Sequence, residues 1–108
     1  MKLLLVTTVS EYQKDVLKLF KKTNIEAFSS SEIDGYKNTN SLIATQSWFP
    51  GKKGGNESLM LFSFTKEEKI TDLFKYLKEY NEKLETNNPV RAVVLPVEQS
   101  LWQWSIIN

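Results

Sequence analysis

One pattern occurs twice in the chain, and it restricts the possible folds more than any other feature. A short apolar run is followed by a hydroxyl residue and, three positions later, by Gln or Glu. Ser10 and Gln13 form this pair in the first half of the chain, and Thr65 and Glu68 form it after the run "SLMLFSF" of residues 58–64. Such a pair is typical of a capping box at a helix N-terminus. The sequence therefore predicts two strands that each lead into a helix.

Each predicted helix has an apolar stripe at helical spacing, which indicates that one of its faces is buried. The first helix is predicted to begin at Ser10. The second is predicted to end before "TNNP", residues 86–89, because Asn88 precedes a proline and is biased away from helical geometry. The stripes consist of Tyr12, Val16, Leu19 and Phe20 in the first helix, and of Ile70, Leu73, Phe74, Leu77, Tyr80 and Leu84 in the second.

Strands are predicted over residues 2–8, 25–33, 58–64 and 90–95, so each half reads strand, helix, strand. This order predicts a single α+β domain over residues 1–108, of the ferredoxin-like βαββαβ type. A four-stranded antiparallel sheet would carry both helices on one face. Its other face would be apolar and bare, and monomers rarely expose a large apolar patch. We therefore expect something else to cover that face.

Composition excludes several classes of function. Fourteen basic and thirteen acidic residues give a net charge of only +1, which provides no general attraction to nucleic acid or to an anionic membrane. The absence of His and Cys excludes zinc enzymes and catalytic triads that use them. The N-terminal apolar run, Leu3 to Val6, is too short for a signal peptide or a membrane span. We expect a cytoplasmic protein that does not insert into a membrane.

The C-terminal extension, about residues 97–108, contains "SLWQWSII", in which Trp102, Trp104 and Ile106 alternate with smaller residues. An extended segment with this alternation places all three on one side. Because Trp is enriched in interface cores, we expect Trp102 and Trp104 to close a homo-oligomer. The alternative is that they pack within their own subunit.

The longest predicted loop, about residues 37–56, lies between the second and third strands. All four glycines fall in or next to it, and it contains three lysines and no acidic residue. Long loops without regular structure are uncommon in compact domains unless they are functional or disordered. One interpretation is a mobile arm that contacts a partner protein through Trp48, Phe49, Lys52 and Lys53. The other is that the segment extends the hairpin and packs on a neighbouring subunit.

The stretch "SSSEIDGYK" resembles the region before the T-loop in PII signalling proteins, in the order Ser29 to Ser31, Glu32, Ile33, Gly35 and Tyr36. The order of the elements and the position of the long loop are also similar over nearly the whole chain. The resemblance implies a non-enzymatic regulator that forms a homotrimer with its sheets facing inward. Small effectors, in many members adenine nucleotides, bind between subunits, and the T-loop contacts a membrane transporter or an enzyme.

The related CutA family is the alternative within the same superfamily. "AVVLPVEQSLWQW" resembles its closing strand, and "SWFPGKKGGNESLMLFSFTKEE" resembles its Trp-bearing hairpin. This resemblance implies a trimeric structural or metal-tolerance protein with a rigid loop. The lack of His and Cys argues against soft-metal binding in either case.

The PII-like fold implies that several strand ends meet around one cleft between subunits. Arg91 in "TNNPVR" stands where nucleotide-binding members carry a Lys, and a guanidinium can bind phosphate in a bidentate way. That turn lacks glycine here and contains Pro89, so a smaller effector fits at least as well as a polyphosphate. The predicted effector-binding residues are Thr7, Thr8, Ser29, Gly35, Tyr36, Lys37, Ser63, Phe64 and Arg91. Ordinary packing of half-buried strands is the alternative role for each of them.

Glu32 and Asp34 are a close acidic pair beside Gly35. Two carboxylates are too few for a cation site unless other groups contribute ligands, so we predict no metal site and no required cofactor. Nothing marks either residue as an activated acid or base, and we expect no enzymatic activity.

Overall fold

The structure is a computed structural model that describes residues 1–34, 57–85 and 88–101. Its elements alternate as the sequence predicts, with a short 3₁₀ turn, Ser10–Tyr12, ahead of the first helix. In chain order the elements are β1 (Lys2–Val9), α1 (Gln13–Lys22), β2 (Ser29–Ile33), β3 (Ser58–Thr65), α2 (Glu67–Lys83) and β4 (Arg91–Pro96).

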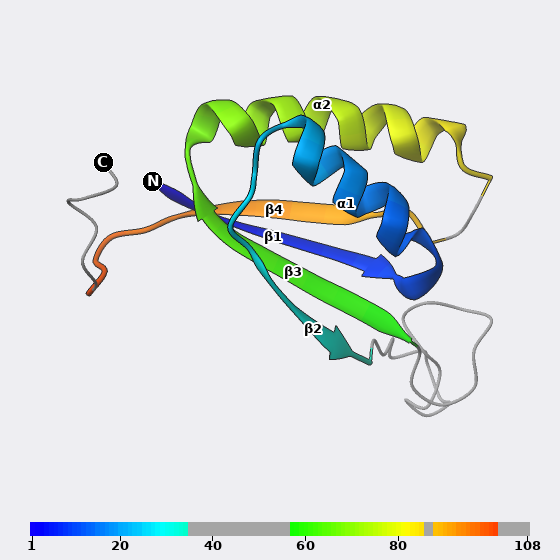
Figure 1. Ribbon diagram of the computed structural model, residues 1–108, viewed down its shortest axis with the longest axis horizontal. Coiled ribbons are helices and arrows are strands. Elements are labelled where there is room, and N and C mark those ends of the chain that lie inside the picture. Colours follow the sequence, from blue (N-terminus) through cyan, green and yellow to red (C-terminus); the bar gives the residue numbers. More distant parts are fainter. Residues whose placement is uncertain (35–56, 86–87, 102–108) are drawn as a thin grey trace, which may run out of the picture.

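The four strands form one sheet in the order β2-β3-β1-β4, and every neighbouring pair is antiparallel. Both helices lie on the same face of this sheet (Figure 1). The predicted α+β, ferredoxin-like βαββαβ fold is therefore confirmed, together with the long connection between β2 and β3. Within the described ranges, no helix is both long enough and apolar enough to cross a membrane.

The core lies between the sheet and the helices. Val16 and Phe20 of α1 are fully buried, as is Leu73 of α2. They pack against the alternate β1 residues Leu4 and Val6, which have no exposed surface. Burying such side chains contributes roughly 1.5–3 kcal/mol each, which makes this layer the main source of stability. The predicted helical stripes are thus confirmed at their central positions.

The predicted capping boxes do not form. Ser10 donates both its backbone N–H (3.0 Å) and its hydroxyl (2.9 Å) to the carbonyl oxygen of Glu57. Tyr12 occupies the N-cap of α1, without a side-chain bond. Thr65 is the last residue of β3, and Lys66 occupies the N-cap of α2 without a side-chain bond. Ser10 thus makes a tertiary contact and Thr65 belongs to a strand, and neither residue caps a helix.

The second strand is shorter than predicted, because residues 25–28 follow the turn that ends α1 and do not join the sheet. Asn24 adopts a positive φ of 62°. Its N–H donates to Lys21, and the N–H of Ile25 donates to Phe20 at 2.9 Å. These two bonds form a Schellman motif with Asn at the left-handed position. Ile25, which is 2% exposed, is the apolar residue that follows the motif and packs into the core.

Candidate functional site

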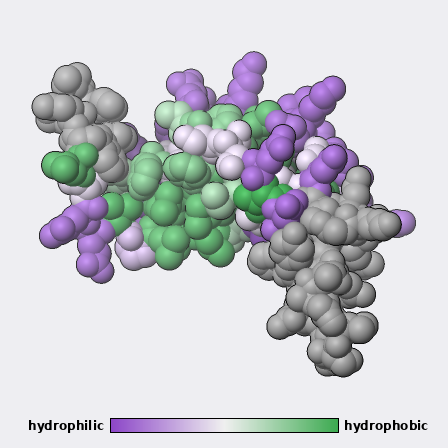
Figure 2. All heavy atoms as spheres, turned by 90° about the horizontal axis from the view of Figure 1, so that it is seen from below, coloured by the Kyte–Doolittle hydropathy of each residue, from purple (hydrophilic) through white to green (hydrophobic). Residues whose placement is uncertain are grey.

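The face of the sheet opposite the helices is apolar and open. Alternation along β1, β3 and β4 places a second set of side chains on this face, and Figure 2 shows them as a continuous hydrophobic surface. Phe64 is 37% exposed, Val93 53% and Leu95 43%. We call this surface the open face; its apolar residues are Leu3, Leu5, Met60, Phe62, Phe64, Val93 and Leu95.

The register explains why the strands are apolar on both sides. Leu5 of β1 stands between Phe62 of β3 and Val93 of β4, and Leu3 stands between Phe64 and Leu95. Cross-strand neighbours of this kind pack side by side, so the open face is one surface and not a set of isolated residues. Phe62 and Phe64 also meet edge to face, with ring centroids 6.5 Å apart. The predicted bare apolar face is present in the described chain.

Thr7 and Arg91 lie together at one end of the open face. They are register partners on β1 and β4, and both are half-buried. A hydroxyl and a guanidinium side by side can bind an anionic or hydrogen-bonding group. Of the predicted effector-binding residues that the structure describes, these two are the pair that it brings together.

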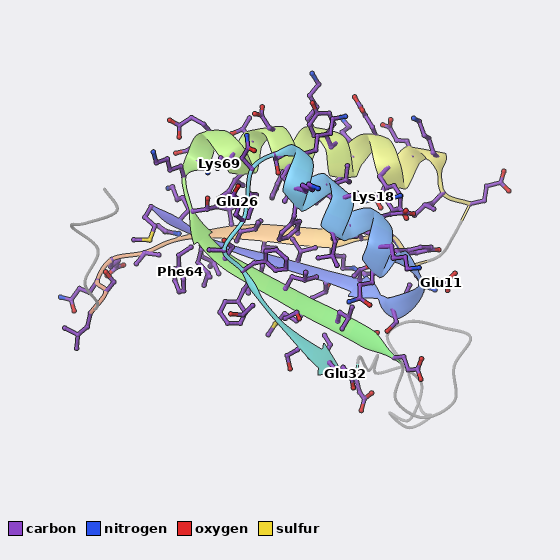
Figure 3. All side chains as sticks on the ribbon, viewed as in Figure 1. Glu11, Lys18, Glu26, Glu32, Phe64 and Lys69 are labelled. Atoms are coloured by element: carbon purple, nitrogen blue, oxygen red, sulfur yellow. The ribbon has the colours of Figure 1, made fainter. Side chains whose placement is uncertain are left out.

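Phe64 and Ser29 lie away from that pair within one subunit. Phe64 is opposite Leu3, at the other end of β1 from Thr7, and Ser29 is opposite Phe62. Figure 3 shows Phe64 and Glu32 at opposite ends of the sheet. Within one subunit, the described effector-set residues therefore do not all lie in a single pocket.

Thr8 and Ser63 face the helices and already have internal partners. Thr8 is fully buried, and its hydroxyl donates to the carbonyl of Val9 at 3.1 Å. Ser63 is 3% exposed, and its hydroxyl donates to the carbonyl of Ala27 at 2.6 Å. Since a buried hydroxyl without a hydrogen bond is costly, these bonds give both positions a structural role.

The remaining predicted residues lie outside the described part of the chain. They are Gly35, Tyr36 and Lys37 of the effector set, Trp48, Phe49, Lys52 and Lys53 of the partner-binding set, and Trp102 and Trp104 of the oligomer interface. Within the described ranges, no group of three acidic side chains is arranged closely enough to hold a metal ion, and the absence of a metal site stays a prediction.

A pocket of about 440 Å³ lies at the ends of β2 and β3, and the sequence analysis missed most of it. Glu32, Asp34 and Glu57 line it, with Ser10 and Ser58. In the described lining, these three carboxylates are joined by no basic residue. Glu57 was missed because it becomes a neighbour of Ser10 only through the pairing of β1 with β3.

Comparison with solved structures places this fold among PII-like proteins. A Thermus thermophilus protein classed as PII-like signalling matches with a TM-score of 0.58 and 15% identity, over 86% of this chain and 82% of that one. CPII, a nitrogen regulatory PII-like protein from Thiomonas intermedia bound to ADP, AMP and bicarbonate, matches with a TM-score of 0.58 and 13% identity. That match covers 93% of this chain and 94% of CPII. No family model and no curated protein matches the sequence. The chain thus has the PII-like fold.

Proposed function

We propose that the protein is a PII-like regulator that works as a homotrimer and has no enzymatic activity. The observation that carries this proposal is the open face on a PII-like fold. Seven apolar side chains from three strands form that surface. Burying it against other subunits would remove apolar area from water and so stabilise an assembly. Three inward-facing sheets would bury all three open faces at once.

The effector is proposed to bind in the clefts between subunits, and Thr7 and Arg91 are the described residues that we place there. They stand at the end of the open face, where a neighbouring subunit would complete the site. An adenine nucleotide is the proposed ligand class, supported by the adenine nucleotides bound to CPII. AMP or ADP suits this chain better than ATP, because the chain offers one arginine and the nearby pocket is lined by three carboxylates.

The partner is proposed to contact residues 37–56, with Trp48 and Phe49 as anchors and Lys52 and Lys53 at the rim. A transporter or an enzyme is the expected kind of partner. Effector binding would favour one state of this segment over another, which requires the effector to bind the two states with different affinity. Asp34 and Glu57, the described residues on either side of this segment, both line the acidic pocket. A ligand bound near that pocket would therefore lie close to both ends of the segment.

A thermal-shift series with AMP, ADP, ATP and bicarbonate tests the effector proposal. A ligand at a hundred times its dissociation constant stabilises the folded state by about 2.7 kcal/mol. We expect AMP or ADP to raise the melting temperature and Arg91→Ala to reduce that rise strongly. Lys75→Ala, which removes an exposed positive charge from α2, is the matched control and should leave the rise unchanged. No shift with any adenine nucleotide would refute this ligand class.

A further inference from the structure

A second apolar surface lies on the other side of the molecule, between α2 and β4. It is a groove of about 380 Å³. Its apolar lining comes from Phe74 and Leu77 of α2 and from Val90 and Ala92, before and within β4. Lys78, Asn81 and Glu82 of α2 complete the lining. Phe74 is 37% exposed although it belongs to the apolar stripe of its helix. The groove therefore exposes part of the α2 stripe to solvent.

The groove runs beside β4, an edge strand of the described sheet. β4 is the last strand of the order β2-β3-β1-β4, so β1 pairs with one of its sides. Across the described residues, no strand pairs with its other side. An edge strand presents a row of backbone donors and acceptors that can accept a further strand. An edge next to an apolar groove is the arrangement that proteins use to bind an extended segment by strand addition.

The chain itself contains a segment with the required chemistry. Trp102, Trp104 and Ile106 alternate along the end of the chain. Six extended residues span about 20 Å, which is the length of a six-residue strand such as β4. The alternation would direct all three apolar side chains to one side of an added strand. Trp also buries a large apolar area when it enters such a groove.

The described residues before this segment lead away from the groove of the same subunit. After β4 the chain continues past the end of the sheet and away from both helices (Figure 1). Leu101, the last described residue, is 97% exposed. Residues 97–101 thus lead away from the groove of their own subunit, which favours a neighbouring copy as the acceptor.

We propose that residues 102–107 of a second copy of this chain add to the free edge of β4, with Trp102, Trp104 and Ile106 in the α2–β4 groove. Each copy donates one tail and accepts one. Such a head-to-tail contact closes into a ring when the rotation between copies permits. The inference rests on the self-assembly part of the proposed function and is independent of any effector.

Quenching of tryptophan fluorescence by acrylamide tests this proposal in a Trp48→Phe background, where Trp102 and Trp104 are the remaining tryptophans. The tail should be shielded from acrylamide at concentrations where light scattering shows an assembly, and should become accessible on dilution to the monomer. Phe74→Ala should expose the tail and raise the dissociation constant of the assembly about thirtyfold, the factor for an interface anchor worth about 2 kcal/mol. Deletion of residues 102–108 should weaken assembly at least as much.

Lys75→Ala is the control for Phe74→Ala, since Lys75 is the next residue on α2, is exposed and does not line the groove. Quenching that is identical in Phe74→Ala and in the parent would overturn the inference, as would shielding that persists in the diluted monomer. An assembly that Val93→Lys dissociates but the tail deletion leaves intact would refute the tail contact alone. A protein that is monomeric at every concentration would refute both this inference and the proposed trimer.

Discussion

Asn81 illustrates how much one polar side chain contributes to this fold. Its side-chain amide donates to the carbonyl of Val90 and its carbonyl accepts from the N–H of Val90, both at 2.9 Å. Val90 is 5% exposed, so water cannot easily replace these bonds. The contact fixes the chain just before β4 against the last turns of α2.

We expect Asn81→Ala to lower the free energy of unfolding by about 1–3 kcal/mol, because it leaves buried backbone groups without partners. Urea unfolding measures this loss. Glu79→Ala, at an exposed position of the same helix, should change stability by less than about 0.5 kcal/mol. Equal losses in the two variants would contradict the role assigned to Asn81.

Tyr80 has a raised pKa in the folded chain. Burial raises its pKa, and so does the hydrogen bond from its hydroxyl to Asp15, which is 2.6 Å long. A tyrosine in the unfolded chain ionises near pH 10. Because the folded state keeps the proton to higher pH, the stabilisation is complete below about pH 10 and is lost as pH rises through the folded pKa.

Unfolding midpoints measured between pH 8 and pH 11 should therefore fall more steeply for the parent than for Tyr80→Phe. The difference between the two proteins removes the contributions of the other tyrosines and of the lysines. Parallel pH profiles would show that Tyr80 does not couple its proton to folding.

The helices and strands differ in how well their positions could be predicted from the sequence. The stripes of α1 and α2 and the apolar runs of β1, β3 and β4 were strong local signals, and these elements form as predicted. β2 has no buried residue, so its pattern could not show that it starts at Ser29. Its start depends on the Schellman motif at Asn24, which a strand pattern does not encode.

The candidate site was less predictable, since it depends on which sides of different strands come together. Register makes Thr7 a neighbour of Arg91, and it turns Thr8 and Ser63 toward the helices. Adjacent positions such as Thr7 and Thr8 have the same residue type and opposite environments. Only the pairing of the strands distinguishes a candidate effector residue from a structural one.

Ser63→Ala tests that distinction at the level of the elements. The bond from Ser63 to Ala27 ties the segment before β2 to β3, so its removal should cost about 1 kcal/mol of stability. Stabilisation by a nucleotide should be unaffected. Ser30→Ala, at an exposed position of β2, is the control and should change neither quantity. Loss of the nucleotide response with unchanged stability would instead place Ser63 in the effector site.

At the scale of the whole molecule, the sheet has two apolar faces and the chain's own helices cover one of them. Val93 lies on the other face and is 53% exposed, so it can be changed with little effect on the fold of one subunit. A lysine there would put a charge into the centre of any interface that covers the open face, which is costly without a partner. The position therefore separates assembly from folding.

The most direct test of the proposed trimer is the molar mass of the parent and of Val93→Lys, measured by light scattering during size-exclusion chromatography. Ser30→Lys places the same charge on an exposed residue of β2 and is the control. We predict three times the 12.5 kDa chain mass for the parent and for Ser30→Lys, and a folded chain of 12.5 kDa for Val93→Lys. A parent protein that elutes as a stable 12.5 kDa monomer with its open face exposed would contradict the account.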